Sequence, residues 1–213
     1  FLDQYEVTNE QFVRVLNEIA NTVHLVEDST EHYPRYVHHR TSPDADLIDL
    51  HAEHGGIEHV NESGYRARPG REHVPVVQVS WYAAKLYCES VGKRLPTEDE
   101  WEAAARGRDN RRFPWGDDQP RYQALAIPCD GVVVPKSSLC PEEVAVRAIG
   151  TSPQDVTPEG VHDLAGNVSE WTSSLSTERQ RVARPLAEPA ANAARAGATN
   201  DNGNRWRGSA RAD

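Results

Sequence analysis

The chain contains no methionine and only three cysteines in 213 residues. Three cysteines are too few for a scaffold built on disulfides. No apolar run approaches the length of a membrane span, and no signal peptide is visible. We therefore expect no membrane-spanning segment. The lack of an initiator Met and the abrupt start at "FLDQYEVTN" indicate a trimmed leader or first strand.

Basic side chains are also scarce. The 23 Lys and Arg face 33 Asp and Glu, which gives a formal charge of −10. Neutralising a phosphate backbone requires clustered Lys and Arg, so nucleic acid is not expected as the main partner. The end of the chain, with Arg205, Arg207 and Arg211, leaves a local basic patch open. With 14 Gly, 14 Pro and 38% hydrophobic residues, we expect one domain over residues 1–213, much of it loop.

The three cysteines fall in two settings. Cys129 and Cys140 lie in one loop, "PCDGVVVPKSSLCPEE", where they form either a disulfide or two separate thiols. We predict the disulfide if the protein is made in an oxidising compartment, and that pairing would favour an exported or cell-surface protein. Cys88 lies inside "WYAAKLYCESVG" and is expected to be a buried, inert thiol.

Three segments carry the start signals of helices. Thr8 and Gln11 form a capping-box pattern. Ser80 is expected to cap a second helix, and Thr97 a third, with Glu100 at its N3 position. Each start signal is followed by apolar residues at helical spacing, which we expect on the buried face: Phe12, Val13, Leu16 and Ile19; Trp81, Ala84, Tyr87, Cys88 and Val91; Trp101, Ala104 and Ala105. Glycines at 92 and 107 are expected to end the second and third helices.

Regular structure is predicted to be sparse elsewhere. Residues 22–73 are expected to be a long irregular excursion, which holds eight of the nine His. "VPVVQVSW", Val74 to Trp81, is the best strand candidate, and after "RRFPWGDDQP" almost no helical period returns until about Ala183. Loops of this length in a compact domain are usually functional or held by a metal or a disulfide.

One histidine-rich stretch has the composition of an iron site. "DLHAEHGGIEH" offers His51, Glu53, His54 and His59, which suit a centre of two histidines and one carboxylate. The alternative is a hydrated polar loop, which we favour because no helix or strand signal positions those side chains.

Four blocks appear in a characteristic order: "LDQYEVTNEQFVRVLN", "VPVVQVSWYAAKLYCESVGKRLPTEDEWEAAARG", "RRFPWGDD" and "GVHDLAGNVSEWTSS". Together they closely resemble the sulfatase-modifying-factor family, to which the formylglycine-generating enzymes belong. The resemblance implies an α+β fold, a variant of the C-type-lectin fold with small twisted sheets, few helices and extensive irregular loops. Members usually close with a strand reading roughly "GFR", whereas this chain stops at "SARAD", so a last strand is expected to be missing.

The loop "DLAGNVSEWT" has the composition of a calcium site. Calcium takes six to eight hard oxygens from carboxylates and backbone carbonyls. Asp163 and Glu170 supply carboxylates, and Gly166 and Val168 can turn carbonyls inward because the glycine permits a tight turn. The resemblance implies calcium at these four positions. The alternative is a plain turn in which Asp163 and Asn167 bond their own backbone.

Two family features do not carry over to this sequence. A second calcium site would need an Asn in "RYQALAIPCDGVVV", which has none, and the Cys129–Cys140 pair is a candidate to hold this loop instead. The copper-binding cysteine pair of the enzyme would lie after the "GNVSEW" loop, yet no cysteine follows Cys140. Ser169 replaces an active-site aromatic. Formylglycine synthesis by that mechanism is therefore not expected.

These departures favour a binding module over an enzyme. We expect the C-terminal segment to present a protein or small-molecule ligand surface, as in variable proteins diversified by retroelements. Its candidate residues are Asn202, Asn204, Arg205, Trp206 and Arg207. Trp206 is the natural anchor, and the alternative is that it fills the core. Two other functions remain open: a family oxidase acting on a peptide or metabolite, and a purely structural accessory domain.

Overall fold

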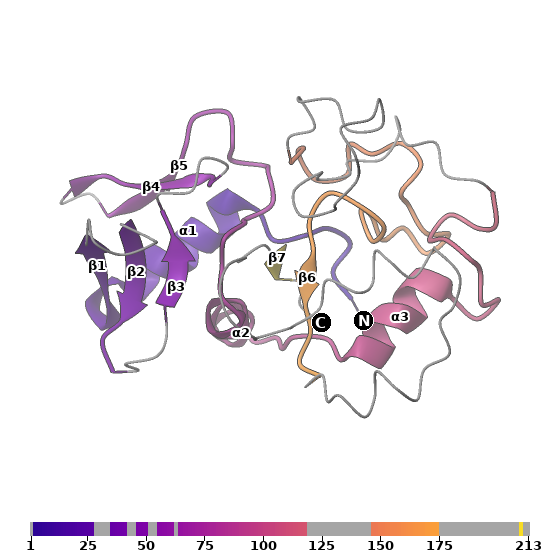
Figure 1. Ribbon diagram of the computed structural model, residues 1–213, viewed down its shortest axis with the longest axis horizontal. Coiled ribbons are helices and arrows are strands. Elements are labelled where there is room, and N and C mark those ends of the chain that lie inside the picture. Colours follow the sequence, from indigo (N-terminus) through magenta and orange to yellow (C-terminus); the bar gives the residue numbers. More distant parts are fainter. Residues whose placement is uncertain are drawn as a thin grey trace, which may run out of the picture.

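The computed structural model describes residues 2–27, 35–41, 46–50, 55–61, 64–118 and 146–174, with the backbone of residues 209–210. Within these ranges it contains three α-helices and three small sheets. In Figure 1, β1–β5 and α1 form one side of the molecule, whereas α3 and residues 146–174 form the other, with α2 between them. A mixed α/β fold with few helices, small sheets and long irregular segments is the predicted class.

The three helices begin where the capping signals predicted. They are α1, Asn9–Glu18, α2, Trp81–Ser90, and α3, Glu98–Arg106. The Thr8 hydroxyl accepts the Gln11 amide at 3.3 Å, and the Gln11 side chain accepts the Thr8 amide at 2.9 Å. No helix within the described ranges combines the length and apolar character needed to cross a membrane.

The inward face of α2 is largely as predicted, with one error. Ala84, Tyr87 and Cys88 are buried, and Cys88 is 0% exposed. Val91 was expected on the same face but is 42% exposed. The helix ends at Ser90, so Val91 is the C-cap residue, and its backbone no longer follows the helical path that would turn its side chain inward.

The prediction of an irregular excursion over residues 22–73 was wrong, because this region contains five strands. Strands β1–β3 form an antiparallel sheet in that order, and β4 pairs with β5 as an antiparallel hairpin. Their bounds are Val23–Glu27 for β1, Arg35–His39 for β2, Asp46–Asp49 for β3, Ile57–His59 for β4 and Tyr65–Ala67 for β5. Strands of three to five residues that mix His, Arg and Glu with few apolar residues leave little apolar signal in the sequence.

The predicted strand over residues 74–81 is also wrong. Only two isolated bridges form there, Thr8 with Pro75 and Ile48 with Val79. Pro75 has no N–H to donate to a ladder, and Gln78 takes a left-handed backbone with φ of 62°. The segment is nevertheless deeply buried, since Val76 and Val79 are both 0% exposed. Its apolar run therefore indicates burial and not a strand.

The core lies where α1 and α2 meet the sheets. Phe12 and Leu16 of α1, Val37 at the centre of β2 and Ala84 of α2 are each at most 3% exposed. α1 contacts β5 and α2, and α2 contacts β3. The apolar stripes predicted for α1 and α2 are thus what joins the sheets to the helices.

Candidate functional site

The loop Asp163–Asn167 is held by buried polar side chains. Asp163 is 1% exposed, and one of its carboxylate oxygens accepts the Gly150 amide at 2.7 Å. Its other oxygen, Oδ1, is buried and has no hydrogen-bond partner in the part of the chain that the structure describes. Both Asp163 and Asn167 take left-handed backbone conformations, with φ of 58° and 61°. Asp and Asn tolerate this region better than most residues.

Asn167 ties the loop to two distant segments. Its Oδ1 accepts the Arg147 amide at 3.0 Å, and its Nδ2 donates to the buried carboxylate of Glu6 at 3.1 Å. Nδ2 also donates to the Arg147 carbonyl at 3.2 Å. The side chains of Asp163 and Asn167 therefore bond the segment 147–150 and the N-terminal segment, and do not simply close a turn on their own backbone.

Asp155 holds the loop through both its side chain and its backbone. Its Oδ2 accepts the Ala165 amide at 2.8 Å, and its backbone carbonyl accepts the Asp163 amide at 3.0 Å. Asp155 and Glu6 are each 1% exposed. Neither was predicted from the sequence, because a single acid in "QYEV" or "SPQDV" belongs to no recognisable motif. Their role appears only when the fold brings them together.

Glu170 lies in a different environment from Asp163. It begins β6, Glu170–Trp171, and its carboxylate accepts a hydrogen bond from the indole N–H of Trp101 on α3. Gly166 and Val168 lie between the two acids in the chain and are half-buried. No group of three or more imidazole, thiol or carboxylate side chains converges as a metal site within the described residues. A site made from two carboxylates and two carbonyls needs no such group, so calcium at these four residues stays a prediction.

Two tryptophans attach β6 to the rest of the fold. The Trp171 indole donates to the Val79 carbonyl at 3.0 Å, and the Trp81 indole donates to the Thr172 carbonyl at 2.8 Å. The Ser173 amide bonds the Pro96 carbonyl at 2.7 Å. The end of the loop is thereby fixed between α2 and the start of α3, which Figure 1 shows on either side of β6.

An ion pair joins the end of α3 to the segment before the loop. Arg111, whose side chain is 3% exposed, donates to Glu159 at 2.8 Å and to the Ala105 carbonyl at 3.0 Å. The hydrogen bond from this guanidinium lowers the pKa of the Glu159 carboxyl below its ordinary value. The pairing positions residues 157–160, which lead into Asp163.

The predicted ligand residues Asn202, Asn204 and Arg205–Arg207 lie outside the described residues, as do Cys129, Cys140, His51, Glu53 and His54. His59 is on β4, with its ring 5.2 Å from that of Tyr65. The backbone of β7, Ser209–Ala210, pairs in parallel with β6, so that Glu170 lies opposite Ser209. The chain immediately after the predicted ligand segment is thus adjacent to the predicted calcium loop.

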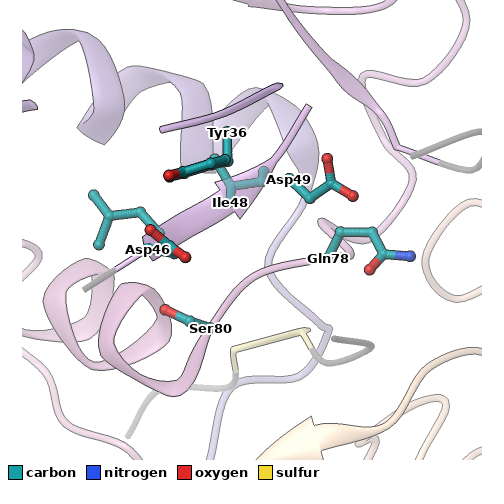
Figure 2. A pocket seen from close by; sticks show the side chains of 7 residues that line it. Tyr36, Asp46, Ile48, Asp49, Gln78 and Ser80 are labelled. Atoms are coloured by element: carbon teal, nitrogen blue, oxygen red, sulfur yellow. The ribbon is translucent and has the colours of Figure 1, made fainter. Parts of the chain in front are cut away.

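A small pocket lies away from this loop, between β2, β3 and the segment that leads into α2. Figure 2 shows Asp46, Asp49 and Gln78 around it, with Tyr36 above and Ser80 at the start of the helix. Ile48 and Leu47 complete the lining. None of the site residues predicted from the sequence lies in it, because it is built on strands that the sequence did not reveal.

Comparison with known proteins identifies one family over the whole chain and relatives over part of it. Residues 1–213 match the family described as "Sulfatase-modifying factor enzyme 1-like domain". The mouse formylglycine-generating enzyme is 42% identical over 117 residues, which are 53% of this chain and 30% of that protein. Serine/threonine-protein kinase Pkn1 of Chlamydia trachomatis is 33% identical over 172 residues, 80% of this chain and 22% of the kinase. The bovine "Inactive C-alpha-formylglycine-generating enzyme 2" is 41% identical over 105 residues, 47% of this chain and 33% of that protein.

The chain therefore spans about a third or less of these curated relatives. Their names include a formylglycine-generating enzyme, a protein called inactive and a kinase, so similarity to this domain accompanies different activities.

Proposed function

Because the chain belongs to the sulfatase-modifying factor enzyme 1-like domain family, we propose that it is a calcium-braced ligand-binding module of that family. The similarity to a kinase over only 22% of the kinase fits a domain that is carried as a module in longer proteins. The similarity to a protein named inactive fits a family fold that persists without the chemistry. Residues 141–213 contain no cysteine, so this chain supplies no thiolate for Cu(I) after the loop.

The observation that carries the calcium part of the proposal is the environment of Asp163. A buried carboxylate oxygen without a donor is costly unless a cation or a proton compensates it. Asp163 Oδ1 is such an atom among the described residues. We propose that calcium is held by the carboxylates of Asp163 and Glu170 and by the carbonyls of Gly166 and Val168. The ion would supply positive charge to both carboxylates. Because Asp163 is in the loop and Glu170 begins β6, binding both would link the loop to β6.

The ligand-binding part of the proposal places recognition in the C-terminal segment. Its candidate residues are Asn202, Asn204, Arg205, Trp206 and Arg207. The pairing of β7 with β6 supports this proposal, since a loop braced by calcium would steady the backbone two residues beyond Arg207. A segment diversified by a retroelement would need such a fixed backbone, because its side chains vary from one protein to another while its backbone must keep the same position.

Thermal unfolding with calcium and with chelator tests the brace. An ion that binds only the folded state stabilises it by mass action, so calcium should raise the Tm of the wild-type chain. Asp163→Asn keeps the size of the side chain and removes its charge, and it should abolish most of that increase. Asp118→Asn is the matched control, because Asp118 is an exposed acid of the same type far along the chain. Equal melting of the wild type in calcium and in chelator would contradict the site.

The ligand surface is tested separately by folding. Replacing Arg205, Trp206 and Arg207 together with Ser should leave the free energy of unfolding nearly unchanged if these side chains face solvent. A buried Trp206 would instead cost about 3–5 kcal/mol on truncation. Failure of this triple variant to fold would end the surface proposal and leave the calcium proposal intact.

A second candidate function is an oxidase of the family, which the 42% identity to a formylglycine-generating enzyme favours. It predicts that the purified chain binds copper or iron and consumes oxygen with a thiol-containing peptide. Metal analysis that finds calcium alone, with no oxygen uptake after copper is added, would reject it.

A further inference from the structure

Two histidines face each other across the outer side of the β1–β3 sheet. His24 and His38 are directly opposite in the antiparallel register of β1 and β2. Their ring centroids lie 5.3 Å apart, with the ring planes at 69°. Val23 and Val37, the neighbours on the other side of the sheet, are buried at 2% and 0%. The pair is therefore carried on a backbone that the core holds in place.

A carboxylate on the third strand orients one of the rings. Asp46 Oδ1 of β3 lies 2.9 Å from His38 Nδ1, and Asp46 is the register partner of His38. With Nδ1–H donated to this carboxylate, the acceptor lone pair of His38 is on Nε2. A carboxylate that holds the far nitrogen of an imidazole in this way is the usual outer partner of a metal-binding histidine.

His24 contributes a ring nitrogen that the described structure does not use. Its Nδ1 is buried and finds no hydrogen-bond partner within the described part of the chain. A buried nitrogen in this state calls for an unseen donor, an ion or a water. Taken with the oriented ring of His38, it gives one candidate ligand nitrogen on each of two neighbouring rings.

The separation of the rings matches that of two imidazoles on one ion. Zinc–nitrogen bonds are about 2.0–2.1 Å, so two imidazoles at a tetrahedral angle place their ring centroids about 5 Å apart. The observed 5.3 Å needs no movement of the strands, only rotation of the side chains. Hard cations such as calcium prefer oxygen ligands, so this pair selects borderline cations instead.

We propose that His24 and His38 form a two-histidine site for a borderline divalent cation such as Zn²⁺, with Asp46 as the positioning residue for His38. No third imidazole, thiol or carboxylate completes a metal-binding group here among the described residues. The proposed site leaves the other coordination positions of the ion to groups beyond these two imidazoles. Tyr36 and Asp46 also line the neighbouring pocket in Figure 2, and the Tyr36 ring lies 6.4 Å from that of His38, so an external ligand has a recess beside the ion.

The test is a Zn²⁺ titration followed by long-range ¹H–¹⁵N spectra, which report each imidazole separately. It is run on the whole chain in saturating calcium, so that the outcome is independent of the calcium loop. The ring nitrogens of His24 and His38 should shift together at one equivalent. His24→Gln and His38→Gln should each remove one calorimetric Zn²⁺ site, and Asp46→Asn should weaken that site about tenfold or more.

His39→Gln is the matched control, because His39 is on the same strand, next to His38 but on the opposite face of the sheet, and its Nδ1 lies 3.2 Å from the Thr41 hydroxyl. It should bind Zn²⁺ like the wild type. Because Asp46 is exposed, Asp46→Asn remains informative if a histidine variant folds poorly. Zn²⁺ shifts confined to other histidines, or wild-type binding by His24→Gln and His38→Gln, would overturn the proposal.

Discussion

The segments 74–79 and 163–167 are both largely buried without forming regular structure, but different groups hold them. Residues 74–79 bury the side chains of Val76 and Val79, both 0% exposed. Their polar contacts run through the backbone, such as the Val76 amide to the Val7 carbonyl at 2.8 Å and the Trp171 indole to the Val79 carbonyl at 3.0 Å. Residues 163–167 are held by the side chains of Asp163 and Asn167, which accept hydrogen bonds from the amides of Gly150 and Arg147. The first segment is thus held by apolar side chains and backbone hydrogen bonds, and the second by buried polar side chains.

Left-handed backbone conformations occur in both segments, but they accompany different kinds of hydrogen bond. Gln78 has φ of 62°, and Asp163 and Asn167 have φ of 58° and 61°. The two loop residues use this conformation to aim their side chains at Gly150 and Arg147. At Gln78 the bond is made by the backbone, whose carbonyl accepts the Asp49 amide at 3.1 Å. We therefore expect substitutions in the two segments to differ in size and even in sign.

The largest effect is expected for Asn167→Ala. This change removes the hydrogen bonds that the Asn167 side chain makes to the Arg147 amide and to the buried Glu6 carboxylate. It should lower the free energy of unfolding by about 3 kcal/mol, measured by urea denaturation. Asn110→Ala is the matched control, because Asn110 has the same left-handed backbone, with φ of 57°, but is exposed. Equal losses in the two variants would show that the backbone conformation, and not the buried bonds, matters.

A smaller loss is expected for Gly150→Ala. Gly150 has φ of 66°, and a Cβ built there would lie 2.5 Å from the Tyr5 ring, which stacks on His162. The strained backbone and the clash together should cost about 2 kcal/mol in a denaturation experiment. Gly160→Ala has a comparable backbone, with φ of 87°, but its Cβ would meet only Gln4 at 3.9 Å. It should cost about half as much, and a larger loss at Gly160 would contradict the role assigned to Tyr5.

These contrasts also explain which parts of the structure were predictable. The starts of α1, α2 and α3 were predicted because each depends on one cap and the three residues after it. The Asp163–Glu170 loop was singled out because acids, glycine and asparagine are concentrated in ten residues. Glu6 and Asp155 were missed because their partners are 161 and 10 residues away in sequence, with no local pattern.

The sheet β1–β3 was missed for a different physical reason. Its strands are four or five residues long, and each buries one or two apolar side chains, such as Val23, Val37 and Ile48. Pairing between strands, and not periodicity within one strand, stabilises it. The outer face carries His24, His38 and Asp46, which look in the sequence like a solvated loop. Interactions of this kind are non-local and leave no short motif.

Gln78→Gly is expected to have the opposite sign from the changes in the loop. Glycine adopts φ near 62° without steric cost, so this change should raise the free energy of unfolding by about 0.5–1 kcal/mol. Asp163→Gly offers the same backbone relief but loses the bond to Gly150, so it should destabilise. Denaturation of the two variants side by side measures the difference. A loss of stability for Gln78→Gly would mean that its side chain has a structural role in the pocket.

The smallest effect concerns the capping boxes of α1 and α3. They differ in their N3 residue, which is glutamine in α1 and glutamate in α3. The α3 box uses Glu100, which accepts the Thr97 amide at 2.7 Å and both terminal nitrogens of Arg94 at 2.7 and 2.8 Å. The hydrogen bond from Arg94, and then the backbone bond at Thr97, lower the pKa of Glu100 from 4.5 to about 2. The α1 box uses Gln11, which does not titrate.

A lowered folded-state pKa means that Glu100 stabilises α3 above pH 4.5 and loses this contribution as the pH falls from 4.5 through about 2. The protection factors of the amides at the start of α3, which are corrected for the intrinsic pH dependence of exchange, should therefore fall over this pH window, whereas those at the start of α1 should show no such step. Glu100→Gln should remove the step from α3, because glutamine retains the cap without the charge. Because Glu100 is exposed, the change in global stability should be slight. A pH step of equal size at both helices would show that acid acts on the whole fold and not on this carboxylate.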